Sequence, residues 1–265
     1  MQASETLTSP RLAREVPATA KRQAQSMNRI AQILAICFGP AMFITWGIGG
    51  VWLARYMPPK IHPDASAQTV AMWYMHHATR IRIGLVFMML ALGFIGFWGV
   101  CIAVQLRRKE GLFPAFTYAQ LVGMAGGTGI ILVPCVLWCT AAYRAGHIPA
   151  TTTQTLNDAG WIGMMGTWLP FTVWACAVGA AILFDPSSDP VFPRWAGYLS
   201  VISGIGFMTG SGVWFTTHGA WSWVGVLGLY EPFVIFGVWV LPLTWLCWKN
   251  LQRGYCHELE LAPEG

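Results

Sequence analysis

The chain has 265 residues and a formal net charge of +5, with 55% hydrophobic and only 10% charged residues. Soluble domains average about 25% charged residues, so this composition excludes an ordinary soluble domain and is typical of an integral membrane protein. It also excludes a nucleic-acid-binding protein, because the basic residues lie at the ends of apolar runs instead of forming a solvated basic surface.

Six apolar runs predict membrane-spanning helices, since about 20 apolar residues in a helix cross a hydrocarbon core about 30 Å thick. The clearest run extends from Ile83 to Val104 without a charge or a proline. The six predicted spans are residues 30–53, 83–104, 116–142, 160–184, 195–215 and 229–248. Turn-forming spacers such as YMPPKIHPD and DPSSDPVFP separate them. The predicted fold is an all-α polytopic bundle of six transmembrane helices.

The flanks of this domain are polar. Residues 1–26 are rich in Ser, Thr, Ala and Arg and lack the apolar segment of a secretory signal, so they are predicted to be a disordered cytoplasmic tail. The transmembrane domain then covers residues 27–251, and residues 252–265 form a cytoplasmic C-terminal tail.

The distribution of Lys and Arg predicts the orientation. With the N-terminus inside, most of the 16 basic residues are cytoplasmic, and the short basic loop Arg107–Lys109 supports this arrangement locally. Both termini are therefore predicted to be cytoplasmic. In the long outer loop before the second span, Val70, Trp73, His77 and Ile81 follow a helical spacing, which predicts a short helix in the membrane interface.

Small residues recur at spacings that allow helices to approach closely in lipid. They are Gly93, Gly96 and Gly99, Gly123 and Gly127, Gly160, Gly163 and Gly166, and Gly206 and Gly210. These faces pack either within a single bundle or against a membrane protein partner or a second copy of the chain.

The prolines suggest an internal repeat. Four of the predicted spans contain a proline, at Pro40, Pro134, Pro170 and Pro242, which is the pattern expected of a duplication of three helices. The second half would then be inverted in the membrane, as in many transporters. The alternative is chance, because proline is common in membrane helices.

Seven residues on the predicted outer side form the candidate ligand-binding site. They are His76, His77, Arg80, Arg82, Asp158, His218 and Glu231. Together, imidazole, guanidinium and carboxylate groups could bind an anion, a proton or a metal ion. The competing interpretation is that these side chains only anchor helix ends at the head groups.

More specific chemistries have less support. His77 and His218 are the one pair that could ligate a haem, and Cys135 and Cys139 share a helix face that could bind Cu(I). Six of the cysteines, including these two, lie in apolar runs, where a small buried side chain is more common than a disulfide. The motifs of P-loop NTPases, GxSxG hydrolases and HExxH metalloproteases are absent, so no catalytic residue and no cofactor is predicted.

The segments RIGLVFMML, AVQLRRKEG, TYAQL, LNDAGW and PVFPRWAGY resemble a family of uncharacterised bacterial multi-helix membrane proteins. The resemblance covers about residues 27–251 and implies a multi-pass protein of the bacterial plasma (inner) membrane. That family has no assigned activity, so the resemblance implies no catalytic residue.

Two functions follow as hypotheses. The first is a binder or carrier of a small hydrophobic or weakly anionic molecule. The alternative is a non-catalytic subunit or scaffold of a larger membrane complex, and a membrane haem or metal redox protein is a third reading. In each case the lipid bilayer is the principal partner and no nucleic acid is expected.

Overall fold

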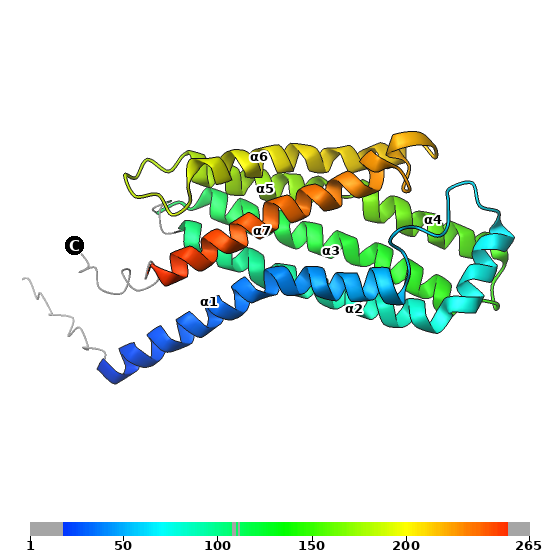
Figure 1. Cartoon of the computed structure of the whole chain (residues 1–265), viewed down its shortest axis with the longest axis horizontal. Helices are drawn as coiled ribbons and strands as arrows, with labels where there is room; N and C mark the ends of the chain where they lie inside the picture. The colour runs from blue at the N-terminus through cyan, green and yellow to red at the C-terminus, as the bar shows by residue number, and fades with distance from the viewer. Residues whose placement is uncertain (1–17, 108–109, 111, 254–265) are drawn as a thin grey trace, which may run out of the picture.

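The computed structural model describes residues 18–107, 110 and 112–253. Every regular element in this part of the chain is a helix. The long helices lie side by side along one axis and form an elongated bundle (Figure 1). The predicted all-α fold class is confirmed.

The bundle consists of α-helices joined or extended by short π- and 3-10 segments. The elements are α1 Ala18–Trp46, η1 Gly47–Leu53, α2 Ala67–Arg107, α3 Ala115–Tyr143, α4 Ala150–Gly166, α5 Leu169–Leu183, α6 Arg194–Phe207, η2 Met208–Trp214, η3 Gly219–Trp221, η4 Val226–Tyr230 and α7 Glu231–Gln252. Helix α1 begins at Ala18, inside the segment predicted as a tail, and residues 1–17 and 254–265 lie outside the described residues.

Helix α2 joins two predicted elements. The predicted interfacial helix at residues 70–81 and the predicted span at 83–104 are one uninterrupted helix of 41 residues. Its first turns run across the end of the bundle before the helix follows the long axis (cyan to green in Figure 1). No proline or turn-forming residue separates the two parts, so nothing in the local sequence ends the helix between them.

The fourth predicted span is interrupted. Helix α4 begins at Ala150, well before the predicted start at residue 160, and ends at Gly166, and two residues separate it from α5. Pro170 lies in the first turn of α5, where the missing N–H costs nothing, whereas a continuous helix would lose a hydrogen bond there. By contrast Pro40, Pro134 and Pro242 lie inside α-helices. The inverted repeat stays a prediction.

The fifth predicted span is also irregular, because α6 ends at Phe207 and the chain continues as the 3-10 helix η2. Five helical segments of the described chain are long and apolar enough to cross a membrane. They are residues 26–53, 67–107, 115–143, 150–183 and 219–252. The prediction of long apolar helices is confirmed for these five segments. The helices within the predicted span 195–215 do not meet the same requirement of helix length and hydropathy.

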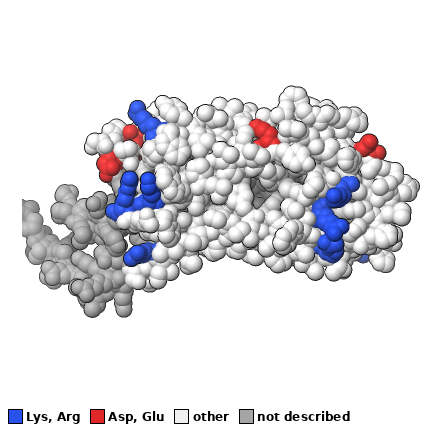
Figure 2. All heavy atoms as spheres, in the orientation of Figure 1, with Lys and Arg blue, Asp and Glu red and all other residues white. Residues whose placement is uncertain are grey.

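The first described turns of α1 and the last turn of α7 lie at the same end of the bundle (Figure 1). We call this the terminal end, and the end that carries the loop 54–66 the loop end. Helix α2 packs against both α1 and α3, and α5 packs against α3 and α6. On the face shown in Figure 2, basic side chains gather at the two ends, and the broad belt between them carries none.

The core is rich in tryptophan. The largest fully buried side chains include Trp98, Trp138, Trp161, Trp174 and Trp239. The rings of Trp98, Trp174 and Trp239, from α2, α5 and α7, meet edge to face with centroids 5.0–5.6 Å apart. Edge-to-face aromatic pairs contribute about 0.5–1.5 kcal/mol beyond the area they bury. Tryptophan is therefore a core residue here as well as an interfacial one.

Glycine allows the central helices to approach closely. A Cβ at Gly123 would lie 2.7 Å from the Trp174 backbone nitrogen, and one at Gly127 would lie 2.9 Å from the Phe171 ring. By contrast, a Cβ at Gly93 or Gly96 would meet no atom within 4 Å. The predicted Gly-rich faces are thus used mostly inside the bundle.

At the terminal end, buried amides connect α2 to α7 and to the loop after α5. Asn250 Nδ2 donates to Gln105 Oε1 and to the Val191 carbonyl, at 3.0 Å each. Gln105 Nε2 donates in turn to the Cys247 carbonyl at 3.4 Å. We call Gln105 and Asn250, with their two carbonyl acceptors, the amide network.

Candidate functional site

Four of the predicted site residues lie in successive turns of α2 at the loop end: His76, His77, Arg80 and Arg82. Each imidazole Nδ1 contacts a backbone carbonyl one turn earlier, of Met72 at 2.7 Å and of Trp73 at 2.8 Å. The Arg80 guanidinium donates to the Trp52 carbonyl at 2.9 Å, and that of Arg82 lies 6.0 Å from the centre of the Tyr143 ring. The two histidines are thus held along their own helix, whereas Arg80 reaches η1 and Arg82 reaches the end of α3.

The other three predicted residues lie on separate elements: Asp158 on α4, His218 before η3 and Glu231 at the start of α7. The Asp158 carboxylate accepts from Asn157 Nδ2 at 3.0 Å. The Glu231 carboxylate accepts from the Thr209 hydroxyl, and the His218 backbone N–H donates to Thr216 Oγ1 at 3.1 Å. These hydrogen bonds do not connect the three residues to one another.

The hydrogen bonds of the seven residues therefore go to groups outside the set. Within the described part of the chain, no group of three or more His, Cys, Asp or Glu side chains is close enough to hold a metal ion. The haem pair of His77 and His218 stays a prediction. The contacts correspond more closely to the anchoring interpretation than to a shared vestibule.

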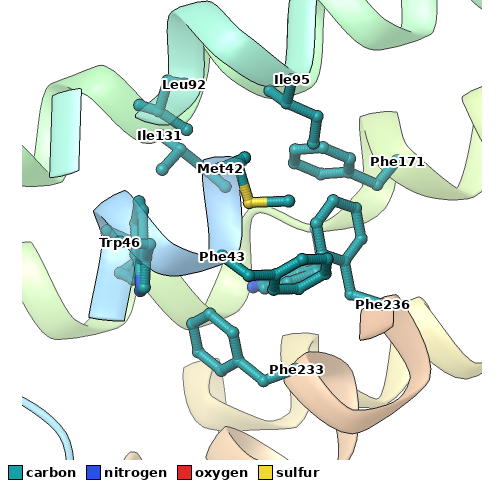
Figure 3. A pocket seen from close by; sticks show the side chains of 11 residues that line it. Met42, Phe43, Trp46, Leu92, Ile95, Ile131, Phe171, Phe233 and Phe236 are labelled. Carbon is teal, nitrogen blue, oxygen red and sulfur yellow. The ribbon is translucent and has the colours of Figure 1, made fainter. Parts of the chain in front are cut away.

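A cavity lies instead in the middle of the bundle, with a volume of about 40 Å³. One water needs roughly 10–15 Å³ on this scale and also needs polar partners. The lining contains aliphatic, methionine and aromatic side chains: Met42, Phe43, Trp46, Leu92, Ile95, Ile131, Met164, Trp168, Phe171, Phe233 and Phe236. Figure 3 shows Met42 reaching between Ile131 and the aromatic rings. An apolar cavity of this kind favours an apolar occupant over water.

Irregular helical segments surround the cavity, and each contributes an aromatic side chain to it. Trp46 is the last residue of α1 before the π-helix η1. Trp168 lies in the break between α4 and α5. Phe233 is the third residue of α7, which directly follows the π-helix η4. Because π-helical turns are uncommon and frequent at functional sites, their position beside the cavity marks it as the candidate functional site.

The cavity wall is anchored to the core on one side and open to the bundle surface on the other. Trp168 packs against Phe171 and Phe233, with ring centroids 5.3 Å apart in each pair. In contrast, Phe43, Trp46 and Phe233 are only half-buried. These three residues come from α1 and α7, and the Trp46 and Phe233 rings, with centroids 6.2 Å apart, form the wall of the cavity between these two helices.

A second buried arrangement lies at the loop end. Tyr56 OH donates to Tyr74 OH at 3.0 Å, and Tyr74 OH donates to Asn157 Oδ1 at 3.2 Å. Tyr56 also stacks on Trp138, with ring centroids 4.4 Å apart. Burial raises the pKa of Tyr56 well above its ordinary value, so its phenol stays a hydrogen-bond donor. We call Tyr56, Tyr74 and Asn157 the hydroxyl network.

The hydroxyl network connects three parts of the chain: the loop after η1, the first turns of α2, and α4. Trp138 Nε1 donates to the Asn157 carbonyl at 3.1 Å and adds α3 to the assembly. All of these groups are buried. Because its polar atoms are partnered within the network, this arrangement has the character of a structural connection between helices.

Comparisons with protein-family models, with curated proteins and with solved structures found no match. The family resemblance suggested by the sequence therefore stays an expectation. The functional argument depends on the geometry of this chain.

The cavity was missed in the sequence because its residues have the same apolar character as those that face lipid. Signals were nevertheless present at its three irregular points. Trp46 is followed by the segment GIGG, Trp168 comes two residues before Pro170, and Phe233 directly follows Pro232. An aromatic residue beside a helix breaker was the pattern that could have located the site.

Proposed function

We propose that this chain is an integral membrane protein that binds a small hydrophobic molecule in the cavity between α1 and α7. The cavity is the observation that carries the proposal. The exposed surface of the cavity is apolar and no charged side chain lines it, which favours a hydrophobic ligand over a weakly anionic one, although the buried indole N–H groups of Trp46 and Trp168 have no hydrogen-bond partner.

The membrane location has independent support. Five described segments have the length and hydropathy of membrane spans. Large apolar side chains also face outward in mid-helix, for example Ile202 and Ile205 of α6, which are 65% and 60% exposed. In water such a surface would favour aggregation, whereas in lipid it is the expected surface. With the basic residues at the two ends, the bundle fits a bilayer along its long axis.

A sixth crossing completes this proposal. Together α6 and η2 cover residues 194–214, and at the rises of the two helix types they extend about 35 Å. This length is sufficient for a hydrocarbon core of about 30 Å. An even number of crossings agrees with the position of both described ends at one end of the bundle (Figure 1). The terminal end is then cytoplasmic, and the bacterial inner membrane is the location that the family resemblance implies.

Access from the membrane makes a carrier or a receptor for a lipophilic molecule the best description. The half-buried residues Phe43, Trp46 and Phe233 lie where α1 and α7 meet lipid, so an apolar ligand can enter without crossing water. The helix breaks beside the cavity allow its walls to move separately from the rest of the bundle.

Photolabelling tests this proposal. Purified protein in detergent is irradiated with a short-chain alkyl diazirine, and the labelled peptides are mapped by mass spectrometry. We expect labelling to concentrate on the segments that contain Met42 and Phe233. Ile131→Phe, which fills the cavity, should reduce this labelling, and Phe233→Ala, which enlarges it, should increase it.

Phe97→Ala is the matched control, because Phe97 undergoes the same truncation at a position that is 62% exposed. It should leave the labelling of the cavity segments unchanged. Equal labelling of cavity and lipid-facing segments in all four proteins would disprove the binding function.

A second candidate function is the membrane subunit or scaffold. The observation in its favour is the open space at Gly93 and Gly96 on the outer face of α2, where another helix can approach without a steric clash. Gly93→Leu should then change the oligomeric state measured by light scattering in detergent. An unchanged molar mass would reject a homo-oligomer through this face.

A further inference from the structure

A second hollow lies at the terminal end of the bundle, where α7 ends and the loop after α5 leads into α6. Its volume is about 360 Å³. Its lining includes charged, amide and indole side chains: Asp189, Trp195, Trp245, Lys249, Asn250 and Arg253. This mixture of cationic and indole groups distinguishes it from the apolar cavity in the middle of the bundle.

The cationic groups of the hollow lie on one face of α7. Lys249 and Arg253 are four residues apart, so their side chains point to the same side of the helix. The Lys249 ammonium lies 4.2 Å from the centre of the Trp245 ring. A cation–π contact of this kind restrains the ammonium group and leaves its N–H groups free to bind an anion.

The floor of the hollow is rigid. Asn250 is 2% exposed and donates from Nδ2 to the Gln105 side chain and to the Val191 carbonyl. Val191 itself lines the hollow and is buried. The amide network therefore fixes α7 against the loop, and the two cationic side chains project from a preformed surface.

In the membrane arrangement proposed above, on which this inference rests, the hollow lies at the depth of the lipid phosphates. Trp195 and Trp245, which are 47% and 53% exposed, lie in its wall, and Trp248 is exposed beside it. Exposed tryptophans together with Lys and Arg at helix ends are characteristic of the head-group region. Basic pockets between helices on the cytoplasmic side are known binding places for anionic head groups.

We propose that this hollow binds the head group of an anionic phospholipid, with Lys249 and Arg253 as the partners of the phosphodiester. The charged residues of the lining, two basic and one acidic, sum to a single positive charge. This sum matches the single negative charge of a phosphodiester better than the higher charge of inorganic phosphate. The glycerol backbone and chains of the lipid then lie along Trp195 and Trp245.

Native mass spectrometry of the full-length protein in detergent tests this site. The probes are phosphatidylglycerol, phosphatidylcholine with the same acyl chains, and inorganic phosphate. We expect the protein to retain phosphatidylglycerol in preference to the other two. The double variant Lys249→Gln/Arg253→Gln should bind it at least about tenfold more weakly, since two charge-assisted hydrogen bonds are lost.

The matched control is Lys60→Gln/Arg144→Gln, which removes two exposed basic side chains at the loop end. It should retain phosphatidylglycerol like the wild type. An equal loss in both double variants would show a general charge effect and overturn the site. So would equal retention of phosphatidylcholine, or inorganic phosphate binding as tightly as the lipid. Because this test does not involve the cavity, its result is independent of the alkyl diazirine experiment.

Discussion

The two buried polar networks, one at each end of the bundle, connect helices by different chemistry. The amide network at the terminal end uses Asn250 as a double donor to two acceptors on different elements. The hydroxyl network at the loop end is a chain, in which each Tyr hydroxyl donates to the next acceptor. Loss of the Asn250 amide therefore leaves two acceptors on different elements without a donor, whereas loss of the Tyr74 hydroxyl leaves one donor and one acceptor without a partner while the ring keeps its packing. The comparison predicts that the terminal end is the more sensitive to substitution.

The largest effect is expected for Asn250→Leu. It leaves Gln105 Oε1 and the Val191 carbonyl without their donor, and an unsatisfied buried acceptor costs about 1–3 kcal/mol. We expect a lower thermal unfolding midpoint of the protein in detergent, measured by loss of the monodisperse peak. Gln252→Leu, an exposed position two residues away on α7, is the control and should change the midpoint little.

A smaller effect is expected for Tyr74→Phe, which keeps the ring and removes the hydroxyl between Tyr56 and Asn157. Net hydrogen-bond contributions are about 1 kcal/mol in folded proteins and average about 0.6 kcal/mol in a membrane bundle. The unfolding midpoint should fall by less than in Asn250→Leu. Tyr118→Phe, on an exposed tyrosine, is the control. A fall larger than that of Asn250→Leu would contradict the proposed difference between the networks.

The smallest effect is a change in alkaline sensitivity at Tyr56. Burial raises its pKa in the folded protein above the unfolded value of 10.0, so its contribution to stability is complete below about pH 10. That contribution is lost as the pH rises above the unfolded value. Between about pH 8 and pH 10.5, the unfolding midpoint of Tyr56→Phe should therefore fall less than that of the wild type. Parallel curves for the two proteins would contradict this.

The existence of the helices could be predicted because a bilayer admits few alternatives. A long uncharged run such as 83–104 must satisfy its backbone groups internally, and a helix is the direct solution. The breaks could not be predicted in the same way. Pro40 and Pro134 lie inside continuous helices, whereas the chain breaks just before Pro170. The outcome at each proline depends on the helices packed around it, which the local sequence does not contain.

The candidate site, too, could be predicted from the sequence only in part. Charge and residue type placed His76, His77 and Arg80 together at one end of the bundle, but did not indicate that the two imidazoles would contact carbonyls of their own helix or that Arg80 would donate to the Trp52 carbonyl of η1. The aliphatic cavity residues gave no chemical signal, because Leu92 and Ile131 are of the same residue types as lipid-facing positions. Leu92 and Ile131 line the same cavity only because several helices pack together around it.

Helix α2 carries part of each arrangement described above: Tyr74 of the hydroxyl network, Leu92 and Ile95 of the cavity, Trp98 of the tryptophan core and Gln105 of the amide network. All five residues belong to one unbroken element, so a shift of α2 that suits one site displaces the others. Occupation of the cavity and integrity of the two ends are therefore thermodynamically coupled, and the coupling is reciprocal. A ligand that selects one position of α2 changes the equilibrium constant for opening either end, and opening of that end changes the affinity for the ligand by the same factor.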